Sequence, residues 1–169
     1  MMMRGILSTL LVFATLGTVS AQAEDPKELD TFKDWQAYTY RAPDSKVCFA
    51  FSAPKKSEAS KKAKRDEIRF IVTNHPGKKV RGQISTIIGY PFKEGSEVKL
   101  EIDDKSFTLY PVGDTAWAGD EDAAIVEAMK AGTSLKVTGI SWKGTETIDS
   151  YSLSGISAAI DEIDKACAN

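Results

Sequence analysis

Polar and apolar residues alternate along much of the chain, with the period of two that is typical of half-buried β-strands. In one such segment Val98, Leu100 and Ile102 share one face, and Lys99 and Glu101 share the other. Similar segments, rich in β-branched and aromatic residues and bounded by turn-forming residues, predict strands over residues 35–40, 46–52, 67–73, 83–90, 97–102, 106–112, 115–118, 134–142 and 146–153.

Two local features modify this pattern. Asp103 and Asp104 stand between two alternating segments, which predicts a tight hairpin turn at that point. The alternation changes phase at Gly139, which predicts a β-bulge within the strand there.

Two segments have a helical period instead. Asp120 is the expected cap of the first helix, which runs to residue 131 and stops at Gly132. The second helix begins between residues 154 and 157, with Ser157 as the expected N-cap, and continues to the C-terminus. Its apolar stripe predicts a buried face made of Ile156, Ile160, Ile163 and Cys167.

The two cysteines are predicted to meet where this last helix packs. Cys48 and Ala50 share the small-residue face of their strand, while Val47, Phe49 and Phe51 share the opposite face. A docked helix needs small residues beneath it, so we expect the C-terminal helix to lie across this face with a Cys48–Cys167 disulfide. The alternative is two separately buried thiols.

These elements predict a mainly β fold: a single-domain β-sandwich or partly closed barrel with one inserted helix and a C-terminal helix. The length of 169 residues suits one domain. We expect a signal peptide over residues 1–23, a flexible lead-in over 24–33 and the β domain over 34–169.

The signal peptide rests on three features of the first 23 residues. Arg4 supplies a positive start, residues 6–16 form an apolar run, and Ala21 and Ala23 give a small-x-small cleavage site. The apolar run is shorter than the about 20 residues that span a bilayer, and we expect no transmembrane span after cleavage. Export places the chain in the periplasm, where disulfides persist, and surface exposure or secretion remains open.

Charge is distributed unevenly along the chain. Residues 46–81 carry 11 Lys and Arg against three carboxylates, a net charge of +8, whereas the net charge of the whole chain is −2. The densest cluster predicts an exposed loop and a candidate patch for an anionic ligand, made of Lys55, Lys56, Lys61, Lys62, Lys64 and Arg65. A solvated loop without a ligand is the alternative, and the lack of aromatic residues in it disfavours nucleic acid as the partner.

Candidate catalytic chemistry is sparse. Two cysteines and one histidine cannot form a four-ligand zinc site by themselves, and His75 stands in a turn where it is expected to be solvated. We therefore predict no catalytic residue, no metal and no cofactor. A carboxylate pair in a cleft stays open as an alternative, and Asp114, Asp120 and Glu121 are the first candidates because they cluster near Trp117.

Several stretches of the chain, taken in order, resemble one family. They are residues 32–40, Cys48-Phe49, residues 54–58, Ile88-Gly89-Tyr90-Pro91-Phe92-Lys93, Gly113-Asp114-Thr115-Ala116-Trp117-Ala118, residues 128–132 and residues 149–159. Together they are similar to the invasion associated locus B family of exported bacterial proteins, over nearly all of residues 34–169. The resemblance implies a periplasmic or envelope-exposed protein of alphaproteobacterial type, associated with virulence in some members and with no established enzymatic reaction.

The chain also departs from the family pattern in its cysteines. Many members of the family have a cysteine just after the first tryptophan, where this chain has Tyr38-Thr39-Tyr40. A later cysteine pair of some members is absent around residues 114–119. The resemblance therefore implies a branch with fewer disulfides.

Together these features predict an exported protein of the periplasm or cell envelope that binds and does not catalyse. The expected partner is an envelope component or another protein, with an anionic glycan or lipopolysaccharide as the candidates for the basic patch. Two alternatives are a cell-wall or glycan hydrolase that uses a carboxylate pair, and a surface adhesin.

Overall fold

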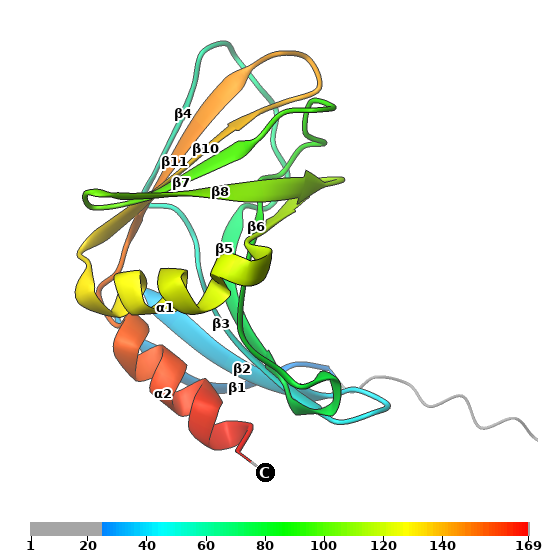
Figure 1. The fold of residues 1–169 in the computed structure, drawn as a ribbon, viewed down its shortest axis with the longest axis vertical. Coiled ribbons are helices and arrows are strands. Elements are labelled where there is room, and N and C mark those ends of the chain that lie inside the picture. Colours follow the sequence, from blue (N-terminus) through cyan, green and yellow to red (C-terminus); the bar gives the residue numbers. More distant parts are fainter. Residues whose placement is uncertain (1–24, 169) are drawn as a thin grey trace, which may run out of the picture.

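The computed structural model describes residues 25–168, and the predicted signal peptide therefore lies outside the described residues. The predicted mainly β fold, with one inserted helix and one C-terminal helix, is confirmed (Figure 1). In chain order the elements are β1 (Lys27–Phe32), β2 (Trp35–Arg41), β3 (Lys46–Ser52), β4 (Lys56–Ala59), β5 (Arg69–His75), η1 (Pro76–Lys78), β6 (Val80–Ile87), β7 (Val98–Ile102), β8 (Lys105–Val112), β9 (Thr115–Trp117), η2 (Gly119–Glu121), α1 (Asp122–Ala131), β10 (Ser134–Ile140), β11 (Glu146–Ser152) and α2 (Ile156–Ala166).

The strands form one antiparallel sheet in the order β1-β2-β3-β5-β6-β9-β8-β7-β10-β11-β4. The sheet is not closed, because β1 and β4 are its two edges. The longest departure from sequential order follows β3, where the chain crosses to the far edge, forms β4 against β11, and returns to form β5 beside β3. A second departure places β9 beside β6, so that β7 and β8 lie beyond it and β10 pairs with β7. Figure 1 shows β4 beside β11 at one end of the molecule and β1 with β2 at the other.

Both helices lie on the same side of the sheet, as Figure 1 shows. On α2 the buried residues are Ile156, Ala159, Ile160 and Ile163, which is the apolar stripe that the spacing predicts. Beneath the helix lie the small side chains of Ala37, Cys48 and Ala50, all fully buried. The predicted disulfide between Cys48 and Cys167 is present, and it ties the end of α2 to the centre of β3.

The expected flexible lead-in over residues 24–33 is corrected by the structure. Lys27–Phe32 form β1, which pairs with β2 from Lys27 opposite Thr39 to Phe32 opposite Trp35. The segment is polar because it is an edge strand: Leu29 and Phe32 are half-buried against the core, and its other side chains are exposed. Polar edge strands resist pairing with other chains.

The expected bulge at Gly139 is also corrected, since β10 keeps an unbroken register with β11 across this residue. A different constraint explains the glycine. A Cβ atom there would lie 2.6 Å from Ile88 Cδ1 and 2.9 Å from Phe92 Cε1, which is closer than packed atoms tolerate. The predicted Asp103-Asp104 turn does join β7 to β8, with Asp103 in the left-handed region at φ 48°.

The two predicted helix caps differ from those observed. Asp120 lies in η2, and the residue that precedes α1 is Glu121, which makes no capping side-chain hydrogen bond. The residue that precedes α2 is Gly155 and not Ser157. Gly155 has a φ of 97°, and a Cβ atom on it would lie 1.9 Å from the Phe32 carbonyl oxygen. The chain therefore needs glycine where α2 begins, because β1 passes directly beside it.

Candidate functional site

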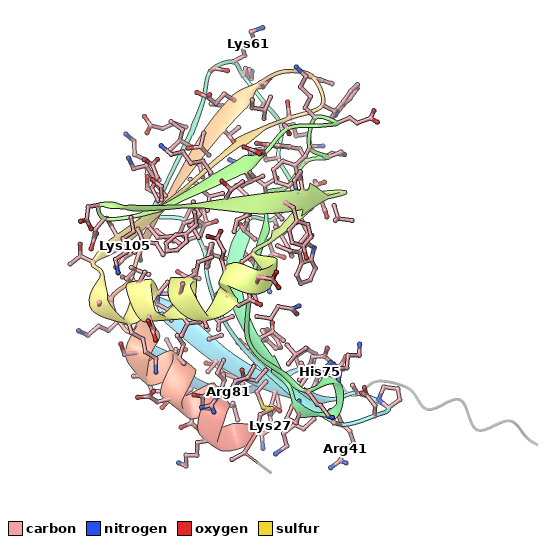
Figure 2. All side chains as sticks on the ribbon, viewed as in Figure 1. Lys27, Arg41, Lys61, His75, Arg81 and Lys105 are labelled. Carbon is pink, nitrogen blue, oxygen red and sulfur yellow. A yellow bond between two sulfur atoms is a disulfide. The ribbon has the colours of Figure 1, made fainter. Side chains whose placement is uncertain are left out.

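The predicted basic cluster does not form a single patch. Lys55 forms an ion pair with Asp34, and Lys56 forms one of 2.9 Å with Glu58 on the same strand, β4. Lys61, Lys62 and Lys64 are exposed in the turn after β4, and none of them has an ion pair or a hydrogen bond within residues 25–168. Figure 2 shows Lys61 at the end of the molecule farthest from α2.

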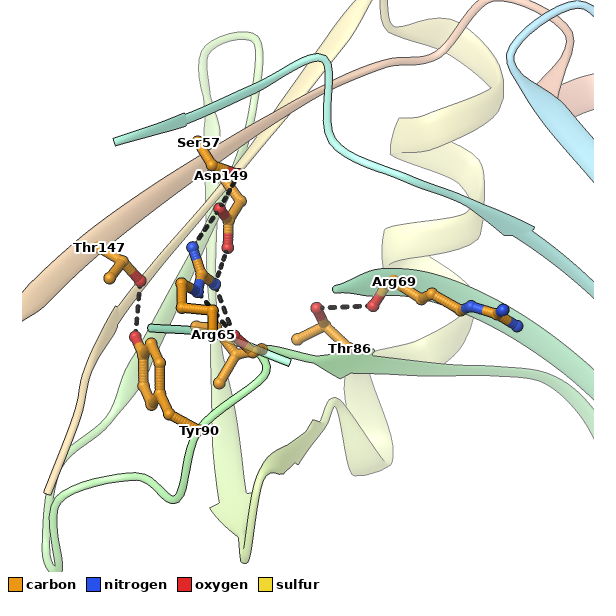
Figure 3. Close-up of polar contacts among 8 residues, drawn as sticks. Ser57, Arg65, Arg69, Thr86, Tyr90, Thr147 and Asp149 are labelled. Carbon is orange, nitrogen blue, oxygen red and sulfur yellow. Dashed lines mark hydrogen bonds and ion pairs between the residues drawn. The ribbon is translucent and has the colours of Figure 1, made fainter. Parts of the chain in front are cut away.

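Arg65 departs from the prediction, because its guanidinium group is buried and bonded internally (Figure 3). Its Nη1 and Nη2 atoms donate to the two carboxylate oxygens of Asp149 at 2.7 and 2.5 Å. Its Nε and Nη2 atoms also donate to the Ile88 carbonyl oxygen at 2.9 and 2.6 Å. The Arg65 side chain is 9% exposed and that of Asp149 is 0% exposed, so Arg65 is not part of a surface patch.

Further polar and aromatic contacts surround this ion pair. Ser57 Oγ donates to Asp149 Oδ1 at 2.7 Å, and the Arg65 guanidinium lies 5.1 Å from the centre of the Tyr90 ring. The hydroxyl groups of Tyr90 and Thr147 share a hydrogen bond of 2.6 Å, and burial raises the pKa of Tyr90. A buried ion pair needs such additional bonds to offset the loss of solvation.

This buried cluster fixes the position of the turn that carries the three lysines. Before the turn, the Ser60 amide donates to the Glu146 carbonyl oxygen at 2.9 Å; after it, the Asp66 amide donates to the Gly89 carbonyl oxygen at 2.9 Å. We therefore define the basic turn as Lys61, Lys62 and Lys64. Sequence reasoning missed the anchor, although the alternation of β11 does place Asp149 on the core face, where a carboxylate requires a cation.

The carboxylates that we considered for catalysis lie on the surface. Asp114, Asp120 and Glu121 are all exposed, and Glu121 contributes with Glu97 and Glu146 to an open groove of about 580 Å³. Residues 25–168 contain no group of three or more His, Cys, Asp or Glu side chains placed to hold a metal ion.

His75, the single histidine, is engaged with a carboxylate. Its Nε2 atom lies 2.9 Å from Asp44 Oδ1, and this hydrogen bond lowers the pKa of Asp44. Both residues lie near the hairpin that joins β5 to β6, away from the carboxylate groove.

The face of the sheet opposite the helices is unusually apolar. We call it the open face, and it spans β2, β3, β5, β6, β9 and β8. Cross-strand pairs run across it from Tyr38 to Phe49, from Phe51 to Ile71, and from Ser85 through Trp117 to Tyr110. Its large side chains that stay partly or fully exposed are Tyr38, Tyr40, Phe49, Phe51, Ile71, Ile87, Tyr110, Val112 and Trp117.

The open face contains a groove of about 670 Å³. Tyr40, Phe49, Tyr110 and Trp117 contribute rings to its lining, and Tyr110 is 53% exposed. Outward faces of antiparallel sheets are ordinarily polar, whereas this one presents aromatic rings to solvent. The sequence contains this signal in the Val47-Cys48-Phe49-Ala50-Phe51 alternation, which is apolar on both faces of the strand.

The fold and these surfaces define a class of protein: a small β domain, stapled by one disulfide, whose helices cover one face of an open antiparallel sheet. The chain matches the family "Invasion associated locus B (IalB) protein" over residues 35–164. It belongs to this family, as its sequence resemblance predicts.

A solved structure has the same fold. The crystal structure of invasion associated protein B from Bartonella henselae is similar with a TM-score of 0.52 and 16% sequence identity, covering 81% of this chain and 96% of that one. A search among curated proteins finds no match for this chain. In residues 25–168 the helices are too short or too polar to cross a membrane.

Proposed function

We propose that this chain is an exported, non-enzymatic protein of the cell envelope, and that its basic turn holds it to an anionic envelope polymer such as lipopolysaccharide. One observation carries the proposal. Lys61, Lys62 and Lys64 are exposed and lack ion-pair partners in the described part of the chain, on a turn that the buried Arg65–Asp149 pair holds in place.

The export part of the proposal is supported by the disulfide and by the family. The Cys48–Cys167 pair is of the type that persists in oxidising compartments such as the periplasm. The first 23 residues have the composition of a signal peptide. Membership of the invasion associated locus B family is in accord with both.

The non-enzymatic part is supported by how the buried polar groups are used. Arg65, Asp149, Tyr90 and Thr147 are bonded to one another or to the backbone within the core. A catalytic acid or base instead faces a site that substrate can enter. The exposed ammonium groups are suited to long-range attraction of a polyanion, which weakens as salt shortens the Debye length.

The test is binding of the mature oxidised protein to immobilised lipopolysaccharide at low and high salt. Each lysine near an anionic surface contributes about 1 kcal/mol, so replacing all three lysines of the basic turn by Ser should weaken binding by about a hundredfold. The matched control replaces three exposed lysines elsewhere, Lys93, Lys105 and Lys136, and makes the same change in net charge.

The control variant is expected to bind like the wild type. Equal losses in the two variants would show that net charge alone matters, and an unchanged turn variant would remove the basic turn from the proposal. Both variants alter exposed side chains only, so circular dichroism should show the same fold.

The alternative of a glycan hydrolase has one observation in its favour, the open groove lined by Glu97, Glu121 and Glu146. It predicts release of soluble sugar from peptidoglycan or envelope polysaccharide by the purified protein, and loss of that release in Glu146→Gln. The adhesin alternative predicts that protease added to intact cells removes the protein, which a periplasmic location would prevent.

A further inference from the structure

We propose that the groove of the open face is a second binding site, which takes an extended glycan chain whose sugars carry carboxylates. The sugar rings would stack on Trp117, Tyr110, Phe49 and Tyr40, and a uronate group would lie near Lys78 at one end of the groove. This inference does not depend on the basic turn, because the two surfaces share no residue.

The first argument is the cost of exposing this face. A soluble protein rarely leaves large contiguous apolar side chains in water unless they serve an interaction. Here β3 places Phe49 and Phe51 on the outer face, while its inner face already supplies the core with Cys48 and Ala50. The outer rings are not needed for the helix packing that stabilises the fold, so a binding role explains their presence.

The second argument is that the rings are already ordered. Within the groove, Tyr40 and Phe49 contact each other edge to face, with their centres 6.2 Å apart and their planes at 67°. Phe49 is also packed from outside the groove, because it stacks on Tyr38 at 5.7 Å and 18° and on Phe51 at 6.2 Å and 24°. A rigid aromatic surface loses little conformational entropy on binding, and it presents flat faces to the C–H faces of sugar rings.

The third argument is the polar chemistry between the rings. Thr73, Gln83 and Ser85 line the groove, and within residues 25–168 their side chains make no hydrogen bond. Free hydroxyl and amide groups between apolar rings suit a ligand that alternates apolar faces with hydroxyl groups. A sugar chain has this alternation, whereas a lipid acyl chain would leave these polar groups without partners.

The fourth argument is charge. Among the described residues no carboxylate lines the groove, and Lys78 forms its cationic end beside His75, which is hydrogen-bonded to Asp44. The whole chain has a net charge of −2 and its positive charge is concentrated in residues 46–81, so most of the remaining surface repels an anion. The groove is therefore complementary to an acidic chain, and a second acidic copy of this protein is a poorer occupant.

The test is isothermal titration calorimetry of the oxidised protein with three acidic oligomers: galacturonate, mannuronate, and glucuronate that alternates with a neutral sugar. A methyl-esterified galacturonate oligomer is the uncharged control for the galacturonate oligomer. At least one acidic oligomer should bind saturably, and the esterified form should bind more weakly. Trp117→Ala should weaken binding by about tenfold, because aromatic anchors dominate such interfaces. The matched control is Trp142→Ala, which removes a 62% exposed ring outside the groove.

Two further variants keep the result interpretable. Tyr110→Ala removes a 53% exposed ring and serves if Trp117→Ala fails to fold. Lys78→Gln should weaken the acidic oligomer but not the esterified one. Failure of all three acidic oligomers to bind, or an equal loss in Trp142→Ala, would overturn the proposal. The triple Ser variant of the basic turn should bind the acidic oligomer as the wild type does, because it changes the other surface. Loss of oligomer binding in that variant would also overturn the proposal.

Discussion

Removing one partner of the buried Arg65–Asp149 pair should be among the most damaging single changes in this protein. Arg65→Met deletes four hydrogen bonds, two to the Asp149 carboxylate and two to the Ile88 carbonyl. It leaves a fully buried carboxylate with Ser57 as its remaining side-chain donor among the described residues. An uncompensated buried charge of this kind costs about 3–5 kcal/mol, a large part of the stability of an ordinary domain.

The measurement is urea denaturation of the oxidised protein, with Arg65→Met, Asp149→Asn and the double variant forming a double-mutant cycle. The double variant removes both charges, so it should be less destabilised than the sum of the two single variants. A coupling energy of about 2 kcal/mol or more is expected. If Arg65→Met costs less than about 1 kcal/mol, or if the two single effects simply add, the pair does not anchor the turn as described.

The same variant separates stability from binding. Folded Arg65→Met protein keeps the three lysines of the basic turn but loses the ion pair that holds the turn, so it should bind lipopolysaccharide more weakly than the wild type and more tightly than the triple Ser variant. The triple Ser variant of the basic turn should show the opposite behaviour, with weak binding and nearly unchanged stability. Binding by folded Arg65→Met as weak as that of the triple Ser variant would contradict the assignment of the attraction to Lys61, Lys62 and Lys64.

Three other perturbations test the fold. Gly155→Ala should prevent normal packing of α2 against β1, since the added Cβ would lie 1.9 Å from the Phe32 carbonyl oxygen. The near-ultraviolet circular dichroism of this variant should therefore differ from that of the wild type, and an unchanged spectrum would contradict the prediction. Replacing Cys48 and Cys167 by Ala opens a loop with a sequence separation of 119, and should cost up to about 4–5 kcal/mol in urea denaturation, whereas an unchanged midpoint would contradict this. Backbone and side-chain hydrogen bonds from Thr133 and Ser134 lower the pKa of Asp103. The ionised Asp103 carboxylate therefore stabilises the folded protein above about pH 4, and this contribution is lost as pH falls further. The difference in Tm between wild type and Asp103→Asn should therefore narrow on acidification, and a difference that is constant with pH would refute the assignment.

Much of the local structure could be predicted from the pattern of residues. The β3 segment, Lys46–Ser52, has the predicted bounds, and the helical spacing of Ile156, Ile160 and Ile163 identifies the buried face of α2. The Cys48–Cys167 disulfide was predictable because each cysteine lies on a face that local periodicity defines. The faces of a strand or helix depend on residues close together in sequence, so the chain encodes them directly, and the two cysteine faces were enough to predict a bond across 119 positions.

Other features depend on contacts between distant segments, and alternation in one strand carries no information about them. The segment Lys56–Ala59 becomes a strand because it crosses to β11 at the far edge of the sheet. That crossing brings Arg65 to Asp149, 84 positions away in sequence, and turns a predicted surface charge into a buried anchor.

The exposure of the open face also depends on how distant segments pack. The sequence by itself determined that β3 is apolar on both sides, with Cys48 and Ala50 on one and Phe49 and Phe51 on the other. The small-residue side was also the predicted docking surface of the C-terminal helix. Only the tertiary structure decided that α1 packs on the same side as α2, which leaves the opposite side uncovered by either helix. Close packing favours the face where a helix can approach the sheet, and the larger rings are consequently left toward solvent.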